Sequence, residues 1–157
     1  MKIEYPDGAR ALAAFETQGL RLPHISNRDQ INKWEQENIL EAEAKYFSRK
    51  QRSILSETFL LRLHKQMFGT VWNWAGKYRS SDKNIGVPYW DVAVKLRGLC
   101  EDTKQRIESS AESSDEIAVH FHHRLVFIHP FVNGNGRHAR MAADCRDYSS
   151  LMKFVRS

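Results

Sequence analysis

Residues 121–140 read FHHRLVFIHPFVNGNGRHAR. The first part of this stretch predicts a helix that ends just before His129, because a residue that precedes a proline, here Pro130, is pushed out of helical geometry. Asparagine and glycine tolerate left-handed backbone angles, so residues 133–136 predict a loop rather than a longer helix. A further helix can start at about Arg137. The stretch therefore predicts a helix, a tight loop and a second helix.

Helical patterns also cover most of the chain before this stretch. Apolar residues at three- and four-residue spacing predict helices from the Ser26-Asn27 cap to about Arg49, over about 53–68, after Asp91 and over about 114–128. The first helix is predicted to bury Ile31, Trp34, Ala42 and Tyr46, with Asn38 as a polar exception. Ser113 and Glu116 form an S-x-x-E capping box for the last one. We expect a mostly α fold, with a short β-hairpin in the glycine- and aromatic-rich residues 72–90.

Composition limits the class of protein. The chain has 157 residues, 41% apolar and 27% charged, which fits one soluble globular domain. Its net charge of +5 comes from scattered basic residues, so a local anionic ligand is a better use of the excess than nucleic acid. The two cysteines, Cys100 and Cys145, predict no disulfide framework, and no apolar run reaches membrane length. We therefore expect a cytoplasmic protein that binds neither membrane nor nucleic acid.

The loop and the residues after it carry the chemistry of the opening stretch. Alternating Asn and Gly at 133–136 can turn successive backbone N–H groups to one side, which makes a nest for an anion. A helix that starts behind the nest adds its unpaired N–H groups and its positive dipole end. Arg137 and Arg140 lie three residues apart, and arginine forks match phosphate oxygens in paired bonds. His129 is suited to accept a proton near neutral pH, so the residues predict a base beside a bound polyphosphate.

The segment HPFVNGNGRHAR resembles the motif HPFx(D/E)GNGRxxR of the Fic (Fic/Doc) domain family, and is most similar to the type called mobile mystery protein B. The segment WNWAGKYRSSDKNIGV (72–87) is similar to the family's target-binding flap. The resemblance covers about residues 26–144. It implies a Fic-type helical bundle with a short β-hairpin flap next to the active-site loop. Residues 1–25 would be an N-terminal arm and residues 145–157 an atypical C-terminal tail.

The resemblance implies a protein adenylyltransferase, which transfers AMP from ATP to a Ser, Thr or Tyr hydroxyl of a target protein. It implies the following roles: catalytic base His129; phosphate nest Gly134, Asn135 and Gly136; phosphate-holding arginines Arg137 and Arg140. The target would dock at the flap, at about residues 80–88, by strand addition. A cognate regulatory protein, as in toxin–antitoxin pairs, is a further expected partner.

Two departures from the family pattern affect these expectations. Asn133 stands where the family has the Asp or Glu that binds Mg²⁺, and a neutral amide is a weaker magnesium ligand than a carboxylate. The resemblance still implies Mg²⁺ as a cofactor, with Asn133 as its ligand. The family's self-inhibiting helix carries S/T-x-x-x-E-G/N, and residues 33–38 read KWEQEN. Glu37 is therefore the inhibitory candidate, which would pair with Arg140, although Lys33 replaces the Ser or Thr.

Two rival interpretations remain open. The chain could be a non-catalytic module that binds a nucleotide or a partner, which Asn133 and the unusual C-terminus favour. It could also transfer another phosphate-containing group. A zinc site among His120, His122 and His123 is disfavoured, because only an i,i+3 pair is available and no third ligand is evident.

Overall fold

The structure is a computed structural model that describes residues 18–22, 24, 25, 27–47 and 54–145. The predicted arm up to residue 17, the tail from residue 146 and the predicted helix ends at Arg49 and Ser53 lie outside these ranges. Within them the chain forms the elements α1 (Arg28–Phe47), α2 (Glu57–Phe68), a 3₁₀ turn η2 (Tyr89–Asp91), α3 (Val92–Ser109), α4 (Ser114–Ile128) and α5 (Asn135–Asp144). The predicted mostly α fold is confirmed.

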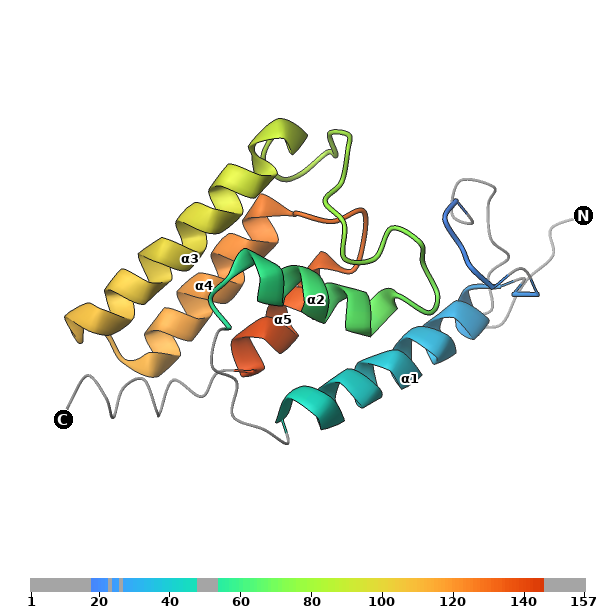
Figure 1. Cartoon of the computed structure of the whole chain (residues 1–157), viewed down its shortest axis with the longest axis horizontal. Coiled ribbons are helices and arrows are strands. Elements are labelled where there is room, and N and C mark those ends of the chain that lie inside the picture. The colour runs from blue at the N-terminus through green and yellow to red at the C-terminus, as the bar shows by residue number, and fades with distance from the viewer. Residues whose placement is uncertain (1–17, 23, 26, 48–53, 146–157) are drawn as a thin grey trace, which may run out of the picture.

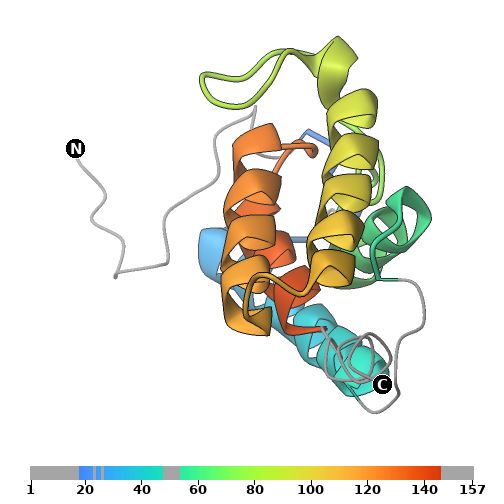
Figure 2. The same cartoon turned by 90° about the vertical axis from the view of Figure 1, so that its left-hand side faces the viewer.

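The helices are arranged around α5, which is short and central. Figure 1 shows α3 and α4 side by side, with α2 crossing α5 and α1 along the other side of α2. Figure 2, turned by 90°, shows the same α3–α4 pair with the loop before α3 above it. The contacts α4–α5, α2–α5 and α1–α2 therefore bring the end of α4, the start of α5 and one face of α1 to a common region.

The buried core follows the apolar periodicity of the helices. On α2, Leu60, Leu63, Met67 and Phe68 are fully buried. The predicted face of α1 is partly wrong, because Trp34 is 41% exposed. The other predicted residues, Ile31, Asn38, Ala42 and Tyr46, are buried, and Glu35 is buried beside them. A carboxylate on the core-facing side of a helix needs a hydrogen-bonded or oppositely charged partner.

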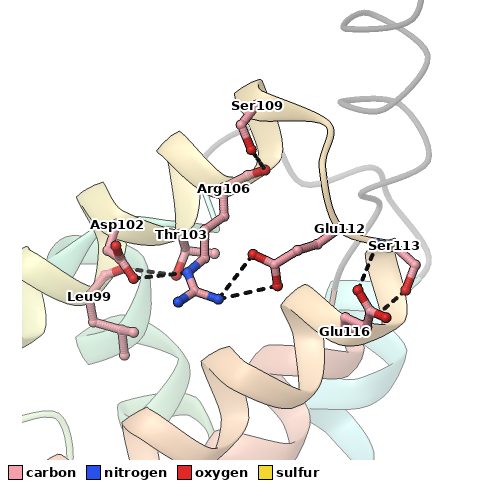
Figure 3. Close-up of polar contacts among 8 residues, drawn as sticks. All are labelled: Leu99, Asp102, Thr103, Arg106, Ser109, Glu112, Ser113 and Glu116. Carbon is pink, nitrogen blue, oxygen red and sulfur yellow. Dashed lines mark hydrogen bonds and ion pairs between the residues drawn. The ribbon is translucent and has the colours of Figure 1, made fainter.

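The turn between α3 and α4 is fixed by polar contacts that Figure 3 shows. The capping box is confirmed: Ser113 Oγ accepts from the Glu116 N–H and Glu116 Oε2 accepts from the Ser113 N–H, both at 3.2 Å. Arg106 donates to Glu112 across the turn at 3.1 Å and contacts Asp102 on its own helix at 3.3 Å. These contacts direct α4 back along α3 and so deliver the end of α4 to the site.

The predicted β-hairpin at residues 72–90 is not confirmed. No strand occurs in the described ranges, and the bridge that involves this segment is an isolated pair between Leu20 and Trp72. Residues 80–88 form bends and irregular backbone instead. Their backbone pairs with the exit of α4 rather than with itself, since the Val87 N–H donates to the Ile128 carbonyl at 3.4 Å. No helix among the described residues has the length and apolar character needed to cross a membrane.

Candidate active site

His129 stands at the exit of α4. Its backbone is left-handed, with φ 54° and ψ 63°, and its N–H closes the helix by donating to the Leu125 carbonyl at 3.2 Å. The side chain is half-buried, and its Nδ1 atom is buried without a hydrogen-bond partner among the described residues. Burial lowers the pKa of His129 below its ordinary 6.5, and the charges of Arg79 and Lys83 lower it further. The imidazole is therefore neutral at pH 7 and able to accept a proton through Nε2.

The loop after His129 is closed by the side chain of Asn135. Its Oδ1 accepts from the Phe131 N–H and its Nδ2 donates to the Phe131 carbonyl, both at 2.9 Å. Gly134, with φ 75°, lies against the Phe68 ring, and a Cβ atom added there would be 2.6 Å from two ring carbons. The amide of Asn135 thus serves the loop itself, which leaves only the backbone N–H of this residue for a phosphate.

His64 supports the loop from below. The Gly76 N–H donates to His64 Nδ1 at 2.9 Å, so the ring proton lies on Nε2, which donates to the Asn133 carbonyl at 3.0 Å. The ring is stacked on Phe131 with a centroid distance of 3.6 Å. Burial holds the pKa of His64 well below 6.5, so the ring stays neutral and keeps this pair of hydrogen bonds.

His138 is a second buried histidine behind the loop. Its Nε2 lies 2.8 Å from the Leu60 carbonyl, to which it donates, and its Nδ1 has no partner among the described residues. Its ring meets that of His64 edge-on at 5.4 Å. Burial lowers the pKa of His138 to about 4. Two neutral histidines therefore form a scaffold directly beneath the loop, and neither contacts the open side of the site.

The open side of the loop is the N-terminus of α5. The helix starts at Asn135, two residues earlier than predicted, with Gly134 as its N-cap. The first N–H groups of a helix have no intrahelical acceptor, and the helix dipole makes this end positive. Gly136 is exposed, and a Cβ atom added there would meet nothing within 4 Å. The structure therefore leaves room for an anionic group at this end of α5.

Arg137 extends from α5 toward α1 and α2. Its Nη1 donates to Glu35 Oε2 at 2.7 Å, and its guanidinium lies 4.8 Å from the Phe68 ring centroid. The Arg137 side chain is 43% exposed, whereas that of Glu35 is 1% exposed. The second oxygen of Glu35 accepts from Trp72 Nε1 at 2.8 Å. The carboxylate is thus fully paired, and it holds one of the two cations predicted to bind phosphate.

The predicted pairing of Glu37 with Arg140 is not present among the described residues. Glu37 is exposed on α1, and the acidic side chain that α1 sends into the site is Glu35. Arg140 lines a pocket of about 320 Å³ together with Asp115 and His122. The structure therefore places the two motif arginines beside different neighbours, and an inhibitory role for Glu37 stays a prediction.

The predicted magnesium ligand, Asn133, is exposed, but its Oδ1 already accepts from the Gly134 N–H at 2.7 Å. No group of three or more His, Cys, Asp or Glu side chains that could hold a metal occurs in the described ranges. Magnesium prefers one or two carboxylates together with phosphate and water oxygens. The described residues do not form a site of that kind, so Asn133 as a ligand stays a prediction.

Two residues of this region were missed by the sequence analysis. Glu35 lies one turn from Ile31 on the buried face of α1, but helical spacing places Trp34 near the same face and so does not single out the glutamate. Arg79 gave no signal in the sequence: it is a single arginine in a loop, yet its side chain is fully buried beside His129.

A family model described as Fic/DOC family matches residues 54–145, which contain α2 to α5 and the loop before α3. The chain belongs to the Fic/DOC family. The region matched contains His129, the loop and both arginines, so the family accounts for the arrangement of helix, loop and helix. No curated protein matches the chain.

Solved Fic structures have the same fold. A Fic family protein from Desulfovibrio desulfuricans G20 aligns with a TM-score of 0.62 and 21% identity, over 79% of this chain and 39% of that one. The BepC protein of Bartonella tribocorum, with bound AMPPNP, aligns with a TM-score of 0.64 and 16% identity, over 85% and 78%. An N-terminal Fic domain from Bartonella quintana, with bound ADP, aligns with a TM-score of 0.62 and 19% identity, over 78% of this chain and 68% of that one. At these identities the likeness shows the fold.

Proposed function

We propose that this Fic/DOC chain is a protein adenylyltransferase, which transfers AMP from ATP to a Ser, Thr or Tyr hydroxyl of a target protein. The observation that carries the proposal is a half-buried, neutral His129 placed directly before a loop and an open helix N-terminus. A neutral imidazole can take a proton from a hydroxyl, and the helix end favours a phosphate. The two groups are separated by only five residues of loop.

Relatives support a nucleotide as the ligand. BepC of Bartonella tribocorum has AMPPNP bound and the Fic domain of Bartonella quintana has ADP bound. In this chain the backbone N–H groups at Asn135 and Gly136 would receive the phosphates, and that of Gly134 would join them once it exchanges its hydrogen bond to Asn133 Oδ1 for one to a phosphate oxygen. Arg137 and Arg140 would hold the outer phosphates, each by charge-assisted bonds worth about 1.5–3 kcal/mol.

The transfer step follows from these positions. The target hydroxyl oxygen attacks the α-phosphorus of ATP in line, and an oxygen–phosphorus bond forms as the bond to the bridging oxygen breaks. Pyrophosphate leaves with the electron pair of that bond. The hydroxyl proton passes to His129 Nε2, because the other ring nitrogen, Nδ1, is buried. Holding the reactants in this geometry is the main contribution expected of the protein in a phosphoryl-type transfer.

The target would dock at residues 80–88. These residues are exposed except for the partly buried Val87, and they pass beside the exit of α4. An extended target segment can add to such a loop through main-chain hydrogen bonds, even though the free loop has no strand in the structure. A cognate regulatory protein remains a further proposed partner, and Mg²⁺ a proposed companion of the nucleotide.

We also propose that Glu35 restrains the enzyme, in addition to the inhibitory role predicted for Glu37. The Glu35 carboxylate occupies Arg137 at 2.7 Å, so an incoming phosphate must compete with it for the guanidinium. A buried charge pair is not easily opened, because a carboxylate left without its partner is costly. Nucleotide binding would therefore be weakened by this contact.

Labelled ATP tests the proposed activity. The protein would be incubated with ATP labelled on the α-phosphate or on the γ-phosphate, with Mg²⁺, alone and with cell lysate, beside a matched His129→Ala variant. We expect protein-bound label from α-labelled ATP only, and only with intact His129. Label from γ-labelled ATP would instead indicate phosphorylation. The absence of label in every arm, including a Glu35→Gln background, would leave the non-catalytic binding module as the better account.

A further inference from the structure

We infer that Arg79 is a positioning residue, which fixes the base His129 and the loop 80–88 in one arrangement so that a hydroxyl delivered by the loop meets the imidazole. The inference rests on the proposed function for the role of His129 as a base. Its structural part, the fixed arrangement, stands on contacts of the described residues alone.

The guanidinium of Arg79 binds carbonyl groups from both sides of this junction. From the α4 exit, Nε donates to the His129 carbonyl at 2.5 Å and Nη2 to the Ile128 carbonyl at 3.3 Å. From the loop, Nη1 donates to the Ser81 carbonyl at 3.0 Å and Nη2 to the carbonyl of Val87. One side chain thus uses four of its five N–H donors to join the loop to the end of α4, whose carbonyls lie 49 and 50 residues from Arg79 in sequence.

The main chain and the loop reinforce this junction. The Arg79 N–H donates to the Pro130 carbonyl at 3.0 Å, just beyond His129. Gly86, with φ 97°, packs so closely that a Cβ atom added there would lie 2.7 Å from His129 Cβ and 2.9 Å from Arg79 Nη2. His129 is therefore enclosed between its own helix and the loop, and Arg79 closes the gap between them.

The setting explains how a buried charge is tolerated here. The Arg79 side chain is fully buried, and Asp82, 3.9 Å away and 55% exposed, is its only ion-pair partner among the described residues. The carbonyls of a helix C-terminus lack intrahelical donors and carry partial negative charge. Arg79 satisfies two of them at the end of α4. A charge in this position also disfavours a protonated imidazole beside it, which keeps the base in its active form.

A lysine cannot take over this function. Arginine presents its donors in a rigid planar fork, whereas lysine carries three donors on one nitrogen at the end of a flexible stem. The Arg79→Lys substitution keeps the charge but cannot reach carbonyls on both segments at once. Comparison of Arg79→Lys with wild type therefore distinguishes the effect of the positive charge at position 79 from the effect of the guanidinium hydrogen bonds.

The test compares three variants of the full chain. Arg79→Lys breaks the junction from the arginine side, and Gly86→Ala breaks it from the loop side by one methyl group. Gly98→Ala is the matched control, because a Cβ atom there meets nothing within 4 Å. Two properties would be measured: the NMR titration of the His129 ring, assigned with His129→Asn, and the transfer of AMP, separated into kcat and the KM for ATP.

We expect both junction variants to lose at least about tenfold in kcat with little change in the KM for ATP, since a misplaced base slows the step without weakening nucleotide binding. The His129 titration should move up toward 6.5, because opening the junction exposes the ring. The inference is overturned if both variants behave like Gly98→Ala. If circular dichroism shows that Arg79→Lys is unfolded, the comparison of Gly86→Ala with Gly98→Ala alone decides whether the inference holds. If the wild-type protein transfers nothing, the proposed function has failed, and the titration alone decides the role of Arg79.

Discussion

Acid should destabilise this protein through His138, the buried histidine behind the active-site loop. Burial lowers its pKa from 6.5 to about 4 in the folded protein. Between these two values the unfolded chain binds a proton at this residue and the folded protein does not. The contribution of His138 to stability is therefore fully present above pH 6.5, and it is lost as the pH falls toward 4.

The size of the effect follows from the two pKa values. The gap between 6.5 and about 4 corresponds to about 3 kcal/mol in the free energy of unfolding, and about 2 kcal/mol of it would be lost on going from pH 7 to about pH 5. This is a large share of the 5–15 kcal/mol that is typical of a domain, roughly speaking. The loop that carries the candidate site packs on this residue, since Phe131 meets the His138 ring at 4.9 Å.

Urea unfolding at pH 7 and at about pH 5 would measure how much free energy of unfolding is lost between these pH values by the wild type, His138→Gln and His123→Gln proteins. Glutamine at 138 keeps an N–H that can donate to the Leu60 carbonyl but has no proton to bind in this range. We expect its pH-dependent loss to be smaller than that of wild type by about 2 kcal/mol. His123 is exposed on α4, so its variant should lose as much as wild type. Equal losses in all three proteins would refute the reasoning.

Two further predictions concern the charge and the shape of the site. Glu35→Gln should raise ATP affinity by about tenfold or more, measured by calorimetry, because it frees Arg137 while the new amide oxygen still accepts from Trp72. Glu37→Gln, on the exposed face of α1, is the control. Equal effects of the two substitutions would contradict the inhibitory role of Glu35. Gly134→Ala should lower the free energy of unfolding by about 1–3 kcal/mol through its positive φ and the contact with Phe68. Gly136→Ala should leave the free energy of unfolding unchanged but weaken ATP binding. A Gly136→Ala protein that is destabilised but binds ATP as tightly as wild type would contradict an anion site at the start of α5.

Local sequence rules were sufficient to predict the helices and the loop between α4 and α5. The capping box at Ser113 and Glu116 and the proline at 130 act over a few residues, so their effect can be derived without knowing the rest of the fold. The two limits that they predict for α4 agree with the structure. The start of α5 was predicted too late, because Asn135 enters the helix once its amide has closed the loop onto Phe131.

The contacts made across the fold could not be predicted in the same way. Helical periodicity identified the buried side of α1 through Ile31, but it could not show that Glu35 rather than Trp34 turns inward. That choice depends on Trp72 and Arg137, which lie 37 and 102 residues away and supply the donors that a buried carboxylate needs.

The residues 72–90 were misjudged for a related reason. Glycines and aromatics predicted a hairpin, in which the two arms would satisfy each other's backbone groups. In the structure the arms bind the exit of α4 instead, through Val87 and through the buried guanidinium of Arg79. A single arginine in a polar loop gives no periodicity and no motif, so its contacts are seen only in the assembled fold.

The most direct test of the central claim is mass spectrometry of the acceptor protein after incubation with ATP. Wild-type protein and His129→Ala would be compared in parallel, and the modified residue would be mapped by fragmentation. The account predicts an AMP group joined to a Ser, Thr or Tyr oxygen with the wild-type protein, and none with His129→Ala. An AMP adduct of equal yield with the alanine variant, or a phosphate group without adenosine, would contradict it.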